Sequence, residues 1–230
     1  MCNKDFNWEE LGTEPHDLHD LGNTITEDEV WEAIKEMSGN KALGLDGFTG
    51  TFFKKCWEII KHSGMRVIQR FSLHTFNLQW LNSVNVVLST KKDGAEGISD
   101  YRPISLVHAT AKIIAKVLSH RLPPPPHMND LVSNARSAFI KRRSIHDNFM
   151  CVRNFAKRLH KCKTPALLFK LDIKKSFDSI KWEYILDLLQ RLGFPNKFWA
   201  WIAVLLSSSS SWILSNGLPG PLVKHRCGLR

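Results

Sequence analysis

The feature that most constrains this chain is an apolar run that ends in an acid. Residues 166–173 have the sequence ALLFKLDI, in which only Lys170 and Asp172 are charged. A nearly continuous apolar run of this length predicts a strand buried in the middle of a sheet. A carboxylate at the end of such a strand is costly unless its charge is stabilised. A hydrogen-bonded turn, a neighbouring cation and a metal ion are all consistent with Asp172.

Helical and strand patterns alternate along the rest of the chain, which predicts a mixed fold of the α/β or α+β class. A capping box of Thr26 and Glu29 begins the first expected helix, Ser144 is expected to cap a later one, and Asp178 or Ser179 another. The expected helices are 24–37, 48–71, 109–122, 145–162, 180–193 and 195–206. The expected strands are 84–89, 101–106 and 166–173, with a hairpin turn at Asn216-Gly217.

Charge is distributed unevenly along the 230 residues. Residues 1–50 have a net charge of −9, whereas residues 51–230 have a net charge of +19. A strongly basic domain favours a polyanionic partner such as nucleic acid, although a solvated basic surface without a partner has the same composition.

Cysteine and hydropathy patterns exclude other classes. The five cysteines are scattered and form no CxxC pair, so neither a disulfide framework nor a zinc module is expected. The longest apolar stretch, 198–206, is shorter than the roughly 20 residues that span a bilayer, and the N-terminus is polar. We therefore expect a soluble, intracellular protein without a membrane partner.

Two basic clusters are candidates for phosphate binding. Lys91, Lys92 and Arg102 flank a glycine-containing turn after an expected strand, where they can clamp phosphates or form a solvated hairpin tip. Lys141, Arg142 and Arg143 directly precede an expected helix N-terminus. Cations at that end oppose the helix dipole, so phosphate contact explains this cluster better than helix stability does.

Four longer blocks occur in order along the chain: YRPISLVHATAKIIAKVLSHRL (101–122), VSNARSAFIKRRSIHDNF (132–149), LLFKLDIKKSFDSIKWEYILDLLQRLGFPNKFWAWI (167–202) and LSNGLPGP (214–221). Their order and spacing resemble reverse transcriptases, and look most like those of plant non-LTR (LINE-type) retrotransposons. The resemblance covers almost the whole chain. It implies an α+β reverse-transcriptase fold with fingers and palm, and the activity of an RNA-directed DNA polymerase.

The resemblance also implies roles for individual residues. Asp172 matches the catalytic, metal-binding carboxylate of the palm, and the carbonyl of Ile173 would face the same Mg²⁺. Phe177 matches the aromatic residue that stacks under the incoming sugar. Lys91 and Arg102 match residues that hold the triphosphate.

The Lys141–Arg143 cluster lies in the segment that meets the template strand in such enzymes. The implied partners are an RNA template, a DNA primer and deoxynucleoside triphosphates. Family members act at nuclear DNA, which implies a nuclear location.

The sequence departs from the family pattern in ways that bear on activity. It ends before the paired aspartates of the family and before the thumb, so half of the palm is expected to be missing and the chain alone is expected not to polymerise. Leu43 and Leu45 replace prolines of the family, and Arg136 and Arg142 replace a common Gln and Gly. The alternatives are a nucleic-acid-binding remnant without catalysis, an inert product, or a maturase-like or telomerase-like relative.

The expected organisation has three parts. Residues 1–47 form an acidic helical extension, residues 48–165 a fingers-like region, and residues 166–230 a partial palm.

Overall fold

The structure is a computed structural model that describes residues 15–39, 43–75, 77–122, 131–132, 136–138, 140, 143–171, 173 and 176–229. Its contacts divide the chain into two compact units. One unit comprises Met1–Arg121 and Ser176–Arg230, and the other comprises Leu122–Lys175. The three-part organisation expected from the sequence stays a prediction.

The first unit contains a four-stranded sheet in the order β2-β1-β3-β4. β1 (Ser83–Thr90) pairs antiparallel with β2 (Tyr101–Leu106) and parallel with β3 (Ser210–Ser215), which pairs antiparallel with β4 (Leu218–Lys224). Pro103 lies on β2, where the edge position tolerates a residue without an N–H. The parallel β1–β3 pair joins segments more than 100 residues apart, so the sheet depends on the helices between them.

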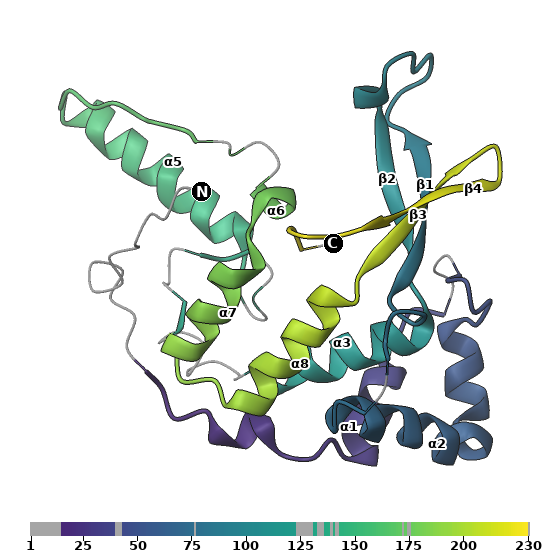
Figure 1. Cartoon of the computed structure of the whole chain (residues 1–230). Helices are drawn as coiled ribbons and strands as arrows, with labels where there is room; N and C mark the ends of the chain where they lie inside the picture. Colours follow the sequence, from purple (N-terminus) through teal and green to yellow (C-terminus); the bar gives the residue numbers. More distant parts are fainter. Residues whose placement is uncertain are drawn as a thin grey trace. The chain divides into compact units, whose positions relative to one another are not determined.

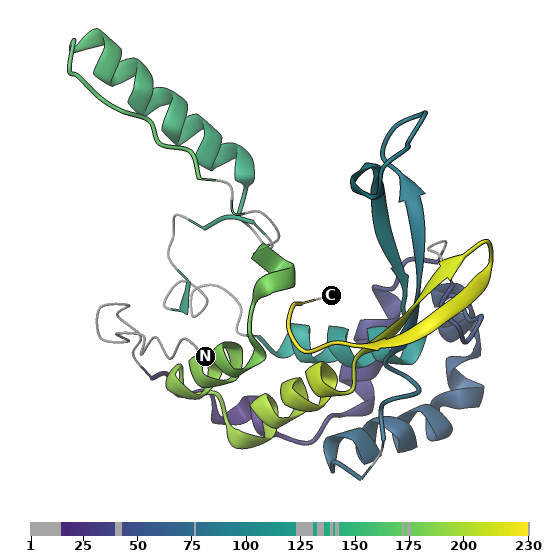
Figure 2. The same ribbon diagram turned by 45° about the horizontal axis from the view of Figure 1, so that its top comes forward.

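Helices below the sheet form the core of this unit (Figure 2). The helices are α1 (Glu27–Lys35), α2 (Gly50–Ser72), α3 (Ala109–Arg121), α7 (Trp182–Arg191) and α8 (Asn196–Ser207). Their contacting faces bury large apolar side chains, among them Val30, Ile34, Phe71, Ile114 and Trp201. The Trp201 Nε1 donates to the Ser72 carbonyl at 3.0 Å, which satisfies the one polar group of this side chain.

Several predictions about local structure are confirmed. Thr26 and Glu29 form the capping box of α1. The turn Asn216-Gly217 joins β3 to β4, with φ of +50° and +81°, which are the left-handed values that a two-residue hairpin turn requires. In the second unit, Ser144 caps α5 (Ile145–Lys161) by accepting a hydrogen bond from the His146 N–H at 3.1 Å.

The strand predicted at 166–173 is wrong. The described residues of this range, 166–171 and 173, are in no helix or strand, and their apolar side chains are exposed, with Leu167 90% and Leu168 77% accessible. A strand is stabilised by backbone pairing with a neighbour, and none of the described strands pairs with this segment.

The helix caps predicted at Asp178 or Ser179 are also wrong. Both residues lie inside the short helix α6 (Ser176–Ser179). The following helix, α7, begins at Trp182 after Lys181, which has an extended backbone, makes no side-chain capping bond and bridges to Cys227. The tertiary bridge therefore sets where α7 begins.

No helix in the described part of the chain is long and apolar enough to cross a membrane. The described cysteines, which are Cys56, Cys151, Cys162 and Cys227, are free thiols. The fold is mixed α+β, as predicted.

Candidate functional site

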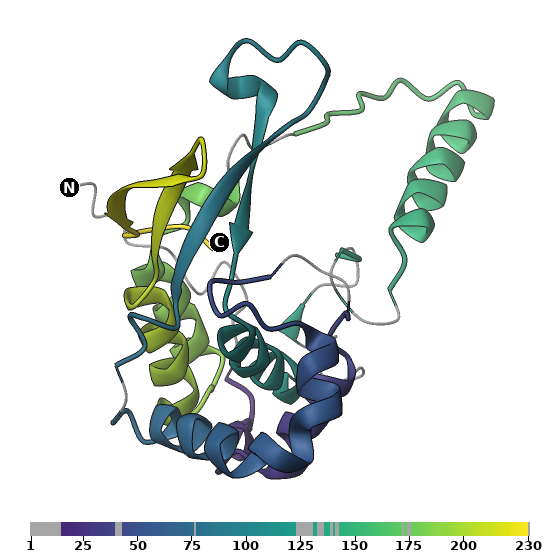
Figure 3. The same cartoon turned by 90° about the vertical axis from the view of Figure 1, so that its right-hand side faces the viewer.

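The β1–β2 ribbon brings together two of the predicted nucleotide-binding residues. Arg102 lies opposite Ser89, and the pairing continues past the strand end because the Lys91 N–H donates to the Asp100 carbonyl at 2.8 Å. Lys91 directly follows the last residue of β1, and Arg102 is the second residue of β2. Lys91 and Arg102 therefore both lie near the tip of the ribbon, which extends away from the helices (Figures 1 and 3).

Acidic and carbonyl groups fix part of this basic tip. The Lys91 Nζ donates to the Ser99 carbonyl at 2.6 Å, and the Lys92 Nζ lies 3.1 Å from the Asp100 Oδ1. The hydrogen bond from Lys92 and a backbone hydrogen bond from Gly97 hold the pKa of Asp100 below its ordinary value. Arg102 is exposed on the ribbon, as a residue that binds a charged ligand must be.

A groove of about 710 Å³ lies against one face of the sheet. Alternate residues of three strands line it: Val84 and Val86, Pro103 and Ser105, and Ser211 and Ile213. Lys112 of α3, the end of α8 at Leu205 and Leu206, and the segment 223–228, which begins at the end of β4, also line it. The groove has an apolar floor with basic side chains from Lys112, Lys224 and Arg226 along it, and one acid, Asp178.

Phe177 of α6 belongs to the same unit, and hydrogen bonds with residues 228 and 229 hold the backbone around it in place. The Phe177 carbonyl accepts from the Leu229 N–H at 2.8 Å, and the Gly228 N–H donates to the Ile180 carbonyl at 2.8 Å. The Trp182 Nε1 donates to the Gly228 carbonyl at 2.8 Å. The side chain of Phe177 is 56% exposed, so the ring is accessible from solvent.

Gly228 makes this arrangement possible. Its φ is +87°, and a Cβ at this position would lie 3.1 Å from the Asp178 carbonyl oxygen. Sequence reasoning missed Gly228 and Trp182, because their partners are about 50 residues away and no local pattern marks them.

Asp46 is a second residue that the sequence did not single out. Its Oδ2 accepts from the Ala109 N–H at 2.7 Å, which caps α3 across 63 residues. The His108 Nδ1 lies 3.6 Å from the same oxygen. Asp46 belongs to the sequence ALGLDG (42–47), in which Leu43 and Leu45 replace the prolines of the family pattern. The hydrogen bond from Asp46 to the start of α3 is therefore formed without those prolines.

The remaining predicted residues belong to the second unit. Asp172, Lys141 and Arg142 lie outside the described residues. Ile173 is 70% exposed. Arg143 donates from Nη1 to the Arg136 carbonyl at 2.5 Å and from Nη2 to the Val132 carbonyl at 3.0 Å, so its guanidinium ties its own loop together.

The predicted Mg²⁺ site has no counterpart in the part of the chain that the structure describes. Within that part, no group of three or more His, Cys, Asp or Glu side chains could hold a metal ion. Magnesium is usually bound by one or two carboxylates together with water and substrate phosphates. Asp172 is outside the described residues, so the absence of such a group does not concern it. The metal role of Asp172 and Ile173 stays a prediction.

Comparison with known families agrees with the motif order. Residues 90–223 match the family model described as reverse transcriptase (RNA-dependent DNA polymerase), and this range contains Lys91, the whole of β2 and the hairpin turn at Asn216-Gly217. The match covers more than half of the chain. The chain belongs to the reverse transcriptase family.

Two curated relatives come from mobile elements. The chain is 28% identical over 208 residues to the transposon TX1 uncharacterized 149 kDa protein of Xenopus laevis, which covers 90% of this chain and 16% of that protein. It is 26% identical over 183 residues to the retrovirus-related Pol polyprotein from type-1 retrotransposable element R2 of Nasonia vitripennis, covering 78% of this chain and 16% of the relative. The chain thus spans about a sixth of the length of these relatives. The predicted family is confirmed, and the plant origin stays a prediction.

Proposed function

We propose that this chain is the nucleotide- and template-binding part of an RNA-directed DNA polymerase from a non-LTR retrotransposon. Its substrates are deoxynucleoside triphosphates, and its partners are an RNA template and a DNA primer. The observation that carries the proposal is the placement of Lys91 and Arg102 near the tip of the β1–β2 ribbon, at the start of the region that matches the family.

The ribbon binds the triphosphate in this proposal. The guanidinium of Arg102 donates two parallel hydrogen bonds to phosphate oxygens, and the ammonium of Lys91 adds a point charge after it leaves the Ser99 carbonyl. Equilibrium binding of a labelled deoxynucleoside triphosphate to the chain with primer and template tests this role. Arg102→Ala should weaken binding about tenfold or more, because charged hydrogen bonds are lost.

Arg66→Ala is the matched control for this measurement. Arg66 is an exposed arginine of α2, outside the region that matches the family. Equal affinities of the Arg102→Ala variant and the wild type would overturn the assignment.

Phe177 stacks under the sugar of the bound nucleotide in the same proposal. Its exposed ring is accessible to a ligand, which supports the assignment made from the resemblance. Phe177→Val should narrow the difference in affinity between dATP and ATP, because a smaller side chain leaves room for a 2′-hydroxyl. An unchanged ratio of the two affinities would remove Phe177 from the nucleotide site.

Asp172 is the metal-binding carboxylate in this proposal, with the Ile173 carbonyl beside it. A divalent ion of the Mg²⁺ type is held by hard oxygen ligands, and the carboxylate type fits that chemistry. Titration with Mn²⁺, followed by electron paramagnetic resonance, gives a readout independent of catalysis. Asp172→Asn should release the ion, whereas Asp187→Asn, on α7, should not.

The activity of the chain alone is a separate question. The resemblance identifies one metal-binding carboxylate, Asp172, among these 230 residues, and we propose that one such carboxylate is too few for these residues to extend a primer by themselves. A primer-extension assay on an RNA template tests this expectation. Mg²⁺-dependent extension that is abolished by Asp172→Asn would contradict it.

A second candidate function is passive nucleic-acid binding, which the net charge of +19 over residues 51–230 favours. In that case RNA affinity falls steeply with salt and falls further when Arg142 and Arg143 are changed to Ala. Failure to bind RNA at low salt would indicate an inert product.

The proposed location is the nucleus, which imaging of a tagged chain tests.

A further inference from the structure

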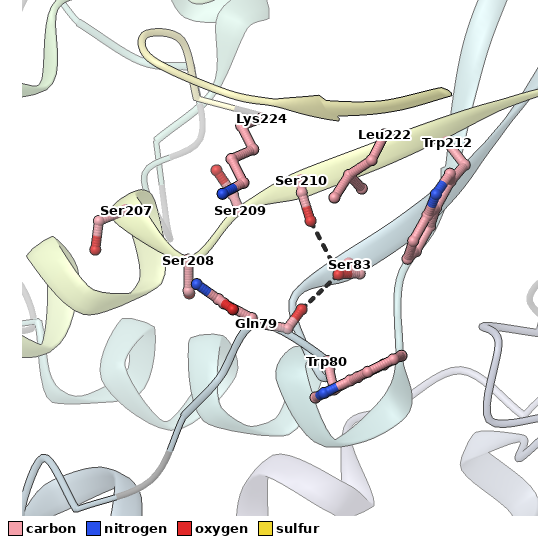
Figure 4. Close-up of a pocket in the computed structure, with 10 residues that line it drawn as sticks. All are labelled: Gln79, Trp80, Ser83, Ser207, Ser208, Ser209, Ser210, Trp212, Leu222 and Lys224. Carbon is pink, nitrogen blue, oxygen red and sulfur yellow. Dashed lines mark hydrogen bonds between the residues drawn. The ribbon is translucent and has the colours of Figure 1, made fainter. Parts of the chain in front are cut away.

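A second cavity adjoins the groove where the sheet meets the end of α8, and the two share Ser209, Ser210 and Lys224 as lining residues. Its volume is about 180 Å³, and Figure 4 shows the residues that line it. Successive strand residues point to opposite faces, which explains why Trp212 lines this cavity alone whereas Ser211 and Ile213 line only the groove. The register places Ser83, Ser210 and Lys224 in one row across β1, β3 and β4.

The serine hydroxyl groups at the floor of the cavity already donate their protons in hydrogen bonds within the protein. The Ser83 Oγ donates to the Gln79 carbonyl, and the oxygens of Ser83 and Ser210 lie 2.9 Å apart. Because the single proton of Ser83 is used by Gln79, Ser210 is the donor in the second bond. Both serines are buried, at 5% and 7% exposure, and what Ser210 offers to the cavity is an acceptor lone pair.

The serines at the end of α8 also donate their hydroxyl protons within the protein. The Ser208 Oγ donates to the Val204 carbonyl at 2.6 Å, and the Ser209 Oγ donates to the Leu206 carbonyl at 2.7 Å. The same two carbonyls also accept from the backbone N–H groups of Ser208 and Ser209, so each hydroxyl adds a second hydrogen bond at the end of the helix. The serine oxygens that line the cavity therefore act as hydrogen-bond acceptors, which favours a ligand with N–H donors.

Two tryptophans and a lysine complete the cavity. In Figure 4, Trp80 lies at its lower edge, Trp212 at its right edge and Lys224 at the top. The indole of Trp80 is 79% exposed, which is unusual for so large an apolar side chain. An exposed aromatic ring at one edge of a cavity, a lysine at another and hydrogen-bonding groups between them are the components that bind single-stranded nucleic acids, with bases stacking on rings and cations near phosphates.

We propose that this cavity, formed by Trp80, Trp212, Ser83, Ser210 and Lys224, binds one base of single-stranded RNA that carries an exocyclic amino group. The volume is below the roughly 300 to 1,000 Å³ of drug-sized sites, so it suits a single ring system. The amino group donates to the Ser210 hydroxyl, the ring stacks on Trp80, and Lys224 lies near a flanking phosphate. The proposed function suggests RNA as the ligand, but the cavity does not include Lys91 or Arg102 at the tip of the ribbon.

Cytosine and uracil provide the sharpest test, because they have the same size and differ at the 4-amino and 4-oxo groups. Fluorescence anisotropy of labelled C5 and U5 RNA with the full chain should show tighter binding of C5. Trp80→Leu should weaken C5 binding roughly fivefold or more. Ser210→Ala should remove the preference for C5 over U5.

The controls keep this test independent of folding and of the proposed function. Trp199→Leu and Lys197→Ala change side chains of α8 outside the cavity and should leave C5 affinity unchanged. Equal binding of C5 and U5, or C5 binding that is unaffected by Trp80→Leu, would overturn the proposal. Cytidine monophosphate that competes as well as C5 would overturn the assignment to a strand. A failure of triphosphate binding at Arg102 would leave these results unchanged.

Discussion

Arg121 donates hydrogen bonds to both carboxylate oxygens of Glu29, at 2.6 Å from Nε to Oε1 and 2.8 Å from Nη2 to Oε2. The same guanidinium donates to the carbonyls of Leu21, Asn23 and Thr24 and lies 5.6 Å from the centre of the Trp201 ring. One buried side chain thus joins the short 3-10 helix η1 (His19–Gly22), α1, α3 and α8.

Replacement of Arg121 should therefore destabilise the whole helical core. Arg121→Ala removes the arginine donors from three carbonyls and from the Glu29 carboxylate, whose Oε2 keeps its hydrogen bonds from Thr26, and this loss should lower the free energy of unfolding by about 3 kcal/mol. Chemical denaturation followed by tryptophan fluorescence measures the change. Arg66→Ala, an exposed arginine of α2, should change it by less than about 0.5 kcal/mol, and equal effects of the two would refute the role of Arg121.

The same pair predicts a pH dependence of stability. Partial burial alone would raise the pKa of Glu29, but hydrogen bonds from Arg121 and Thr26 outweigh it and hold the pKa below its ordinary value of 4.5. A lowered pKa in the folded state means that the unfolded state binds the proton more tightly, so stability rises with pH across this window. The contribution is fully present above about pH 5 and is lost as the pH falls through the folded-state pKa.

Glu29→Gln tests this sign. The difference in stability between wild type and Glu29→Gln should be largest at about pH 6 and should shrink at about pH 3. Glu36→Gln is the matched control, because hydrogen bonds from Lys116 and His120 also lower the pKa of Glu36 but in a solvent-exposed position. Its effect should be smaller and salt-sensitive. A pH-independent effect of Glu29→Gln would contradict the pairing.

Asn82 should stabilise the junction between α8 and the sheet. Its Nδ2 donates to the Leu205 carbonyl at 2.5 Å and to the Ser208 Oγ at 3.0 Å. Asn82→Ala should cost about 1 to 2 kcal/mol, because a part-buried carbonyl at the helix end loses its donor. Thermal unfolding measures the loss, and Asn196→Ala, exposed at the start of α8, should stay near the wild type. A neutral Asn82→Ala would show that the serines cap this helix without it.

Gly228 and Gly217 form a matched pair for backbone strain. Both have φ above +80°, but a Cβ at Gly217 meets nothing within 4 Å, whereas one at Gly228 meets the Asp178 backbone. Gly228→Ala should therefore cost more than Gly217→Ala, by roughly 1 kcal/mol or more. Hydrogen exchange of the Leu229 amide should accelerate only in Gly228→Ala, and equal exchange in both variants would contradict the clash.

Local patterns in the sequence were sufficient to predict most helices and the hairpin turn. The capping box at Thr26, the cap at Ser144 and the turn at Asn216-Gly217 depend on neighbours within four residues, and all three are confirmed. The five consecutive serines at 207–211 connect α8 to β3, since Ser208 and Ser209 bond carbonyls in the last turn of α8 and Ser210 begins β3.

Features that depend on distant partners could not be predicted in this way. The apolar pattern at 166–173 predicts a strand, but a strand needs a neighbour, and none of the described strands pairs with it. The start of α7 depends on a bridge between Lys181 and Cys227, and the cap of α3 depends on Asp46. For the candidate site, Lys91 and Arg102 were predicted from the sequence, and the pairing of β1 with β2 explains why both lie near the tip of one ribbon.

The most direct test of the proposed nucleotide- and template-binding role is template-directed nucleotide selection by the full chain. The measurement is a gel-shift of a labelled DNA primer on an RNA template, with each of the four deoxynucleoside triphosphates in turn. We predict that only the triphosphate complementary to the next template base stabilises the complex, and that Arg102→Ala removes this effect while Arg66→Ala retains it. Equal stabilisation by all four triphosphates, or by none, would contradict a nucleotide- and template-binding role.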